Sequence, residues 1–94
     1  MSDNIYADIA LRIVEEQEEI IGPIAAEQAN RVTGLHINSA NHTAEISGDN
    51  AKVIDALVGL YKEFFGPAAV ETCKEAASKL LPKLNAAELP KSLQ

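Results

Sequence analysis

Hydrophobic residues recur with a helical period over the first part of the chain, up to about Ile21. With about 100° of turn per residue, the apolar positions fill an arc of roughly 200°. They are Tyr6, Ala7, Ile9, Ala10, Leu11, Ile13, Val14, Ile20 and Ile21. Ser2 or Asp3 is expected to cap this helix. So wide an arc indicates a helix that is central to a small bundle or that also packs against a second copy of the chain.

A second long helix is predicted from Asn50 to Phe65, capped within Ser47-Gly48-Asp49. Its apolar residues fall on one face, separate from Lys52, Asp55, Lys62 and Glu63. The apolar set is Val53, Ile54, Leu57, Val58, Leu60, Tyr61, Phe64 and Phe65. This separation predicts a helix that buries one side.

Two further helices are expected directly after these. One runs from Pro23 to Thr33 and ends at Gly34, with small residues on its inner side. The other runs from Pro67 to about Leu81 or Leu84, where Pro82 ends or bends it. Small inward side chains favour close crossing with a neighbouring helix.

The chain repeats itself at an offset of 44 residues. Glu19-Ile-Ile-Gly-Pro-Ile-Ala-Ala-Glu27 returns as Glu63-Phe-Phe-Gly-Pro-Ala-Ala-Val-Glu71. Glycine after a helix end can take a positive φ, and proline suits the first turn of the next helix. Gly22-Pro23 and Gly66-Pro67 are therefore predicted to be equivalent joints, each closing one helix and opening another.

Residues 35–47 have no counterpart in the second unit. Leu35 and Ile37, and then Ala44 and Ile46, alternate with polar residues around a turn-like segment. A short β-hairpin and a plain linker both fit this pattern, because an isolated hairpin is marginally stable unless it packs on something.

The predicted fold is an all-α domain of residues 1–84. Two helix–Gly-Pro–helix units, about 5–34 and 49–81, would be related by an approximate two-fold axis as a four-helix arrangement, with residues 35–47 as an insert. Residues 85–94 form a short C-terminal tail, ordered only if Leu84 and Leu89 find a groove.

The net charge of −6 changes the range of expected partners. An acidic surface repels the phosphates of nucleic acid and of anionic membranes, so neither is an expected partner. The single cysteine excludes an intramolecular disulfide, and no signal-peptide pattern is recognisable at the N-terminus. No apolar run approaches a membrane span of ~18 residues. These features predict a cytoplasmic protein.

The sequence offers little catalytic chemistry, and no enzyme activity, metal or cofactor is predicted. His36 and His42 lack the further ligands of a metal site and read as solvated loop residues. Cys73 lies on the inward side of its helix and is expected to be a buried, inert thiol. Asn41-His42-Thr43 has the form of a glycosylation acceptor, which has no role without export.

The acidic run Glu15-Glu16-Gln17-Glu18-Glu19 lies at the negative end of the first helix dipole, where carboxylates are unfavourable. One interpretation is a solvated face. The other is a docking patch for a basic partner, with Glu15, Glu16 and Glu19 as the candidate partner-binding residues.

The segment Ile20-Ile-Gly-Pro-Ile-Ala25 resembles small helical Gly-Pro-Ile-Ala domains of bacterial signalling proteins. Such domains lie beside kinase, cyclase, forkhead-associated or response-regulator modules. The resemblance covers about Leu11 to Leu81. It implies a bacterial regulatory or adaptor domain without catalysis, and it transfers no binding residue. This chain differs in standing alone, so a catalytic or sensor partner would be a separate polypeptide.

Three hypotheses about function follow. The first is a non-catalytic protein–protein interaction module, a small signalling regulator or adaptor that acts as a homodimer. The second is an acidic inhibitor or immunity-type protein that masks a basic site on an enzyme. The third is a small-molecule sensor with a pocket between the two units, which is less favoured because no polar residue is predicted to point into the core.

Overall fold

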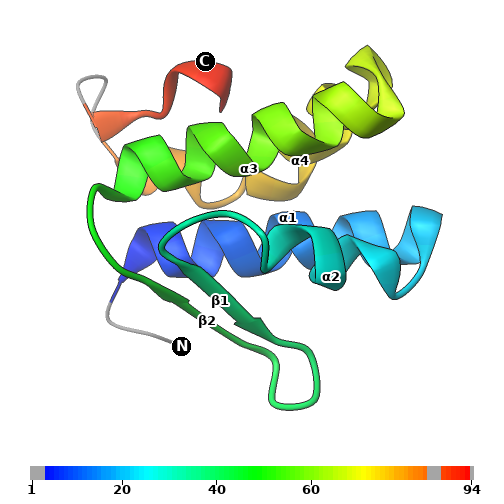
Figure 1. The fold of residues 1–94 in the computed structure, drawn as a ribbon. Coiled ribbons are helices and arrows are strands. Elements are labelled where there is room, and N and C mark those ends of the chain that lie inside the picture. Colours follow the sequence, from blue (N-terminus) through cyan, green and yellow to red (C-terminus); the bar gives the residue numbers. More distant parts are fainter. Residues whose placement is uncertain (1–3, 85–87, 94) are drawn as a thin grey trace.

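A computed structural model describes residues 4–84 and 88–93 of the chain as a helical domain with a small antiparallel hairpin (Figure 1). The elements are α1 (Ile5–Ile21), α2 (Ile24–Ala29), β1 (Leu35–Asn38), β2 (Thr43–Ile46), α3 (Asn50–Phe65) and α4 (Pro67–Ala77), followed by the 3₁₀ turns η1 (Leu81–Lys83) and η3 (Lys91–Leu93). The expected helical domain is confirmed, and residues 35–47 contain the hairpin rather than a plain linker.

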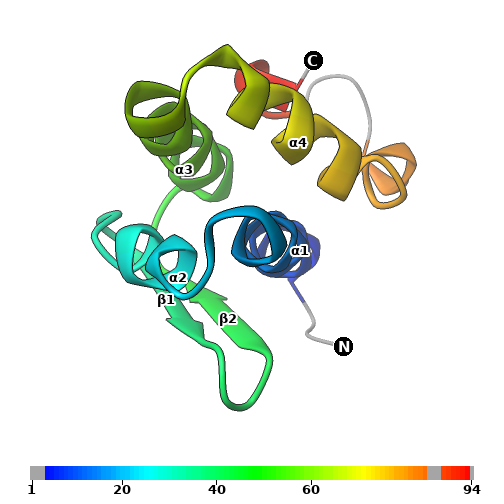
Figure 2. The same cartoon turned by 90° about the vertical axis from the view of Figure 1, so that its right-hand side faces the viewer.

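The helix α1 lies in the middle of the molecule. Viewed along its axis, it has α3 and α4 on one side and α2 and the hairpin on the other (Figure 2). Its fully buried side chains include Ile9, Ile13 and Val14. The central position therefore explains most of the wide apolar arc. Ile20 is the exception, since 64% of it is exposed.

The cap of α1 is Asn4, one residue after Asp3 and two after Ser2. The Asn4 side chain accepts a hydrogen bond from the backbone N–H of Tyr6 at 2.9 Å. Ser2 and Asp3 themselves lie outside the described residues. At α3 the expected cap is confirmed, because the Asp49 carboxylate accepts from the backbone N–H of Lys52 at 3.2 Å.

The two Gly-Pro joints have nearly the same local geometry. Gly22 has φ 77° and ψ −161°, and Gly66 has φ 84° and ψ −179°. Each glycine N–H bonds the carbonyl oxygen four residues earlier, at 2.9 and 2.8 Å. Neither long helix continues through its joint. Both glycines have the expected positive φ, although ψ places them in an extended, glycine-specific region rather than the left-handed helical one.

Two helices end earlier than the pattern predicted. The second helix stops at Ala29 instead of Thr33, because the chain turns there toward the hairpin. The fourth stops at Ala77 instead of Leu81 or Leu84. At its end the Ser78 hydroxyl donates to the carbonyl oxygen of Glu75 at 2.7 Å. The next proline, Pro82, is the second residue of the separate 3₁₀ turn η1.

The hairpin packs on α1 through one face. Leu35 pairs with Ile46 and Ile37 pairs with Ala44, and Leu35, Ile37 and Ala44 are buried. The Asn30 side chain makes two hydrogen bonds with the backbone of β1. Its Nδ2 donates to the carbonyl oxygen of Ile37 at 3.1 Å, and its Oδ1 accepts from the Ile37 N–H at 2.7 Å. The contact with α1 and this paired bond supply the support that an isolated hairpin lacks.

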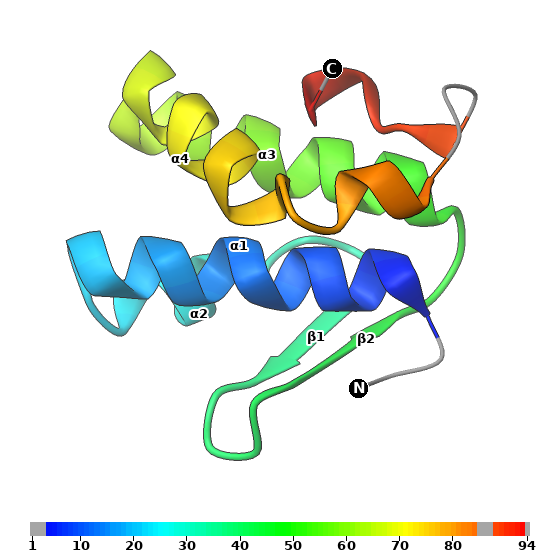
Figure 3. The ribbon, with the colours of Figure 1, turned by 180° about the vertical axis from the view of Figure 1, so that it is seen from behind.

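The described part of the C-terminal segment packs back on the domain. It lies against α3 and α4, with Leu93 and Pro90 buried (Figure 3). Ser92 donates to the Asp55 carboxylate from its hydroxyl at 2.6 Å and from its backbone N–H at 3.0 Å. Leu84 and Leu89, the residues expected to order a tail, are only half-buried.

Candidate functional site

Two buried hydrogen bonds link each long helix to the segment that follows the other joint. Gln17 of α1 donates from Nε2 to the carbonyl oxygen of Ala69 at 3.1 Å, just after the second joint. Tyr61 of α3 donates from its hydroxyl to the carbonyl oxygen of Ala25 at 2.7 Å, just after the first joint. Both joints consequently lie at the same end of the molecule (Figures 1 and 3). We call this the joint end.

The burial of Gln17 contradicts the prediction that no polar residue points into the core. Only 2% of Gln17 is exposed, and its amide also contacts the sulfur of Cys73 at 3.5 Å. The 44-residue repeat in the sequence could have indicated both hydrogen bonds, because their donors and their acceptors are related by that offset. Gln17 and Tyr61 are 44 residues apart, as are Ala25 and Ala69.

Cys73 is buried, as predicted. Burial raises the pKa of its thiol to about 11, against a smaller opposing effect of the hydrogen bond from Gln17. Burial also raises the pKa of Tyr61. Both groups therefore stay protonated at neutral pH, and the thiolate form that nucleophilic or redox chemistry needs is disfavoured.

An exposed apolar patch covers the joint end. Within the described residues every exposed large hydrophobic side chain lies within two positions of Gly22 or Gly66. These are Ile20, Ile24, Phe64 and Phe65, exposed by 64%, 40%, 55% and 37%. The Phe65 ring lies 6.3 Å from the Tyr61 ring and 6.4 Å from the Phe64 ring, between centroids. We call these four residues the joint-end patch: each pair flanks one joint, and both joints lie at the same end of the molecule. Exposed large apolar side chains of this kind often mediate protein contacts.

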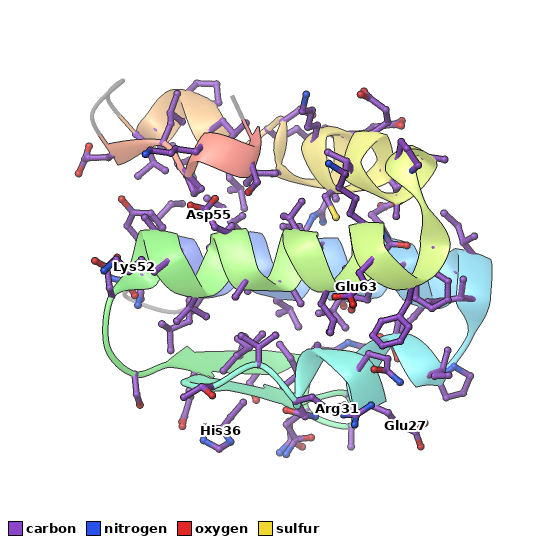
Figure 4. All side chains as sticks on the ribbon, turned by 45° about the horizontal axis from the view of Figure 1, so that its top comes forward. Glu27, Arg31, His36, Lys52, Asp55 and Glu63 are labelled. Carbon is purple, nitrogen blue, oxygen red and sulfur yellow. The ribbon has the colours of Figure 1, made fainter. Side chains whose placement is uncertain are left out.

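Carboxylates surround the joint-end patch. Glu19, Glu27 and Glu63 are exposed, and Figure 4 shows Glu63 on α3 and Glu27 on α2 toward this end. Exposed Lys62 is also adjacent to the patch in sequence. A partner that docks here meets an apolar centre with a mostly acidic rim.

Two carboxylates of the acidic run on α1 contact the hairpin, and the other two have no such contact in the described structure. The Glu15 carboxylate contacts Nδ1 of His42 at 3.0 Å, and the Glu18 carboxylate accepts from the Ser39 hydroxyl at 3.5 Å. These two carboxylates therefore contact the tip of the hairpin. Of the candidate partner-binding residues, Glu19 is exposed and Glu16 half-exposed, whereas Glu15 has this internal partner.

The histidines do not gather into a metal site. His36 is exposed on β1, and His42 is 74% exposed at its side chain although it contacts Glu15. Among residues 4–84 and 88–93, no group of three or more His, Cys, Asp or Glu side chains could hold a metal ion. Over the same ranges, no helix has both the length and the apolar character needed to cross a bilayer.

Comparison with known proteins gives no relative: no family model, no curated protein and no solved structure matches this chain.

Proposed function

We propose that the protein is a non-catalytic protein–protein interaction module, a small cytoplasmic regulator or adaptor of bacterial signalling that acts as a homodimer. The observation that carries this proposal is the joint-end patch. Ile20 and Phe64 expose more than half of their surface beside two rigidly held joints. Apolar side chains gathered in this way are characteristic of an interface.

The repeated architecture supports a symmetric use of this surface. We infer that the two units are related by an approximate two-fold axis, because Gln17 and Tyr61 exchange bonds with equivalent carbonyl groups, 44 residues apart in each case. Ile20 and Phe64 are equivalent under the same offset. A surface with internal two-fold character suits an isologous contact, in which the same patch of each subunit faces the other.

A stable dimer would also have to bury exposed residues around the joint-end patch. A standard interface buries about 800 Å² per partner, which is more than four partly exposed side chains provide. Exposed neighbours on both joints, including Pro23, Lys62 and Pro67, extend the area. Glu19, Glu27 and Glu63 oppose the contact by like-charge repulsion, which salt screens.

The acidic rim favours a second candidate function, the inhibitor or immunity-type protein that masks a basic site on an enzyme. In that reading Glu16, Glu19, Glu27 and Glu63 contact lysine or arginine residues around an apolar anchor. Salt dependence separates the two functions. Added salt strengthens a homodimer whose rims repel, and it weakens a complex with a basic partner.

Light scattering during size-exclusion chromatography tests the homodimer. We expect a dimer at about 50 µM, a concentration at which a standard-size interface is populated. The variant Ile20→Ser/Phe64→Ser should be monomeric with unchanged helix content. Ala56→Ser, a substitution at an exposed position of α3 away from the joints, is the matched control and should remain dimeric. A monomeric wild-type protein at that concentration would refute the homodimer.

A pull-down from the native host at low and high salt tests the second candidate. Recovery of one basic enzyme, lost at high salt and lost with Glu16→Gln/Glu19→Gln, supports the inhibitor. If the neutralised variant recovers the same proteins at low salt, these carboxylates are not a docking patch.

A further inference from the structure

A groove of about 670 Å³ lies between the first half of α1, the hairpin and the end of α4. Its volume falls within the roughly 300–1,000 Å³ typical of small-molecule sites. The residues of its lining that matter here are Leu11, Arg12, His42, Ala44, Lys79 and Leu80. Arg12 and Ile20 are eight residues apart on α1, about 12 Å along the helix. The groove is therefore separate from the joint-end patch.

The apolar part of the groove is aliphatic. Leu11 and Leu80 are half-buried and Ala44 is buried, so together they form a floor of methyl and methylene groups. The described lining contains no Phe, Tyr or Trp, and its one ring is the His42 imidazole. The aliphatic floor of Leu11, Ala44 and Leu80 suits an alkyl chain better than a flat heteroaromatic ring, which packs best against the faces of aromatic side chains.

The charged part of the groove is cationic, which is unusual on a protein with a net charge of −6. Arg12 comes from α1 and Lys79 from the turn after α4. Both are exposed, and neither makes a side-chain hydrogen bond or ion pair with any residue of the described chain. Asp8 is the one carboxylate of the described lining. Two unpaired cations beside an aliphatic floor are complementary to an anionic head on an alkyl chain.

We propose that this groove binds a medium-chain aliphatic carboxylate. The Arg12 guanidinium donates two parallel hydrogen bonds to the oxygens of the planar carboxylate, and Lys79 adds a second positive charge. The alkyl chain lies on Leu11, Ala44 and Leu80. His42 lines one wall of the groove, and its Nδ1 contacts the Glu15 carboxylate. This site is independent of the proposed dimer, since the two surfaces share no residue.

A nuclear magnetic resonance titration of the ¹⁵N-labelled full chain with decanoate, below its micelle concentration, tests the proposal. We expect saturable shifts at the amides of Leu11, Ala44 and Leu80, and smaller shifts at Phe64 and Phe65. Decan-1-ol has the same chain without the charge, and decyltrimethylammonium carries the opposite charge. Both should bind at least about tenfold more weakly, because each lacks the charge-assisted hydrogen bonds.

Matched variants assign the head group. Arg12→Gln/Lys79→Gln should weaken decanoate binding by about tenfold or more while leaving decan-1-ol unaffected. Lys52→Gln/Lys91→Gln removes the same charge from exposed positions outside the groove and should leave the affinity unchanged. This control corrects for the general effect of net charge on anion binding.

Three results would overturn the proposal. The first is the absence of saturable binding. The second is equal binding of decanoate and decan-1-ol, which would leave the cations without a role. The third is a set of shifts centred on Ile20, Phe64 and Phe65 and abolished by Ile20→Ser/Phe64→Ser, which would place the alkyl chain on the joint-end patch.

Discussion

Gln17 and Tyr61 make reciprocal hydrogen bonds across the core: each donates to the carbonyl oxygen of the second residue after the opposite Gly-Pro joint. The donors differ in chemistry, an amide and a phenol, yet they occupy equivalent positions at the 44-residue offset. The core thus contains two separate polar links rather than one network. One link ties α1 to α4, and the other ties α3 to α2.

Removing one link should destabilise the domain moderately. Tyr61→Phe deletes the hydroxyl that bonds Ala25 while keeping the ring, and we expect a loss of about 1 kcal/mol in the free energy of unfolding. Urea denaturation monitored by circular dichroism measures this loss.

Tyr6→Phe is the matched control. Its hydroxyl also donates to a carbonyl oxygen, that of Glu88 at 2.9 Å, but in an exposed setting. Water can replace an exposed bond, so the effect should be smaller than at Tyr61. An equal or larger effect of Tyr6→Phe would show that the core link contributes no special stability.

Replacing the glycine of either joint with alanine should destabilise the domain. At Gly22 and Gly66 an added Cβ would meet no atom within 4 Å, so the penalty comes from the backbone alone. Both have positive φ with extended ψ, a region essentially restricted to glycine. Gly22→Ala or Gly66→Ala should each cost about 1–3 kcal/mol. Differential scanning calorimetry should record a lower melting temperature for each.

Gly59→Ala provides a control of opposite sign. Gly59 is exposed inside α3 with open space around it, so alanine should stabilise the helix by about 0.5–1 kcal/mol. If alanine raised the melting temperature at positions 22 and 66 as well, the assigned joint conformation would be wrong.

The sequence predicted those elements whose signals are local. The bounds of α3 follow from a one-sided apolar face, the Asp49 cap and the Gly66 stop, and the structure reproduces them. The end of α4 was missed because a serine side chain, Ser78, bonds the backbone there without breaking the apolar pattern. The alternation in residues 35–47 was compatible with both a hairpin and a linker. The hairpin forms because it packs on α1 and bonds the Asn30 side chain, and both lie outside residues 35–47.

The candidate site was less predictable because burial depends on which faces meet. Ile20 and Phe64 match the apolar faces of their helices, yet the helices extend past the core and leave both exposed. Conversely, polar Gln17 is buried because its amide finds the carbonyl group of Ala69. The role of Glu15 was also hidden, since the folded hairpin brings His42 to it over 27 residues of sequence.

The buried thiol of Cys73 should make stability depend on alkaline pH. Its folded-state pKa of about 11 lies above the ordinary value of 9.0, so the unfolded chain loses the proton first as pH rises. The stabilisation is complete below about pH 9 and is lost as pH rises toward 11, by at most about 1.4 kcal/mol per pH unit. Urea denaturation between pH 8 and about pH 10.5 measures the slope.

Cys73→Ala removes this contribution, together with the lesser effect by which Cys73 raises the pKa of Tyr61. Tyr61 also has a raised pKa, so both proteins should lose stability in alkali. The wild-type protein should nevertheless lose more than the variant above pH 9. Parallel curves would mean that the Cys73 thiol ionises as readily in the folded protein as in the unfolded chain.

The Glu15–His42 contact should order the hairpin tip without contributing much to global stability. Both side chains are partly or largely exposed, and exposed pairs contribute only about 0–1 kcal/mol. Glu15→Ala should therefore speed amide hydrogen exchange between Asn41 and Ala44 while changing the free energy of unfolding by less than about 1 kcal/mol. Glu16→Ala removes the neighbouring carboxylate, for which the described structure gives no contact to the hairpin, and serves as the control.

The Asn30 side chain should be the stronger support of the hairpin, because it makes two bonds with one backbone residue, Ile37, at a partly buried site. Asn30→Ala leaves both the N–H and the carbonyl group of Ile37 without this partner, and we expect a loss of about 1–3 kcal/mol. Asn38→Ala removes a single exposed bond to the N–H of Asn41 and should cost less. Since β1 buries Leu35 and Ile37 against the domain, Asn30→Ala should also accelerate exchange along the whole strand. If Asn30→Ala changed amide exchange only between Asn41 and Ala44, and not along β1, the Asn30 bonds would not be the principal support of the hairpin.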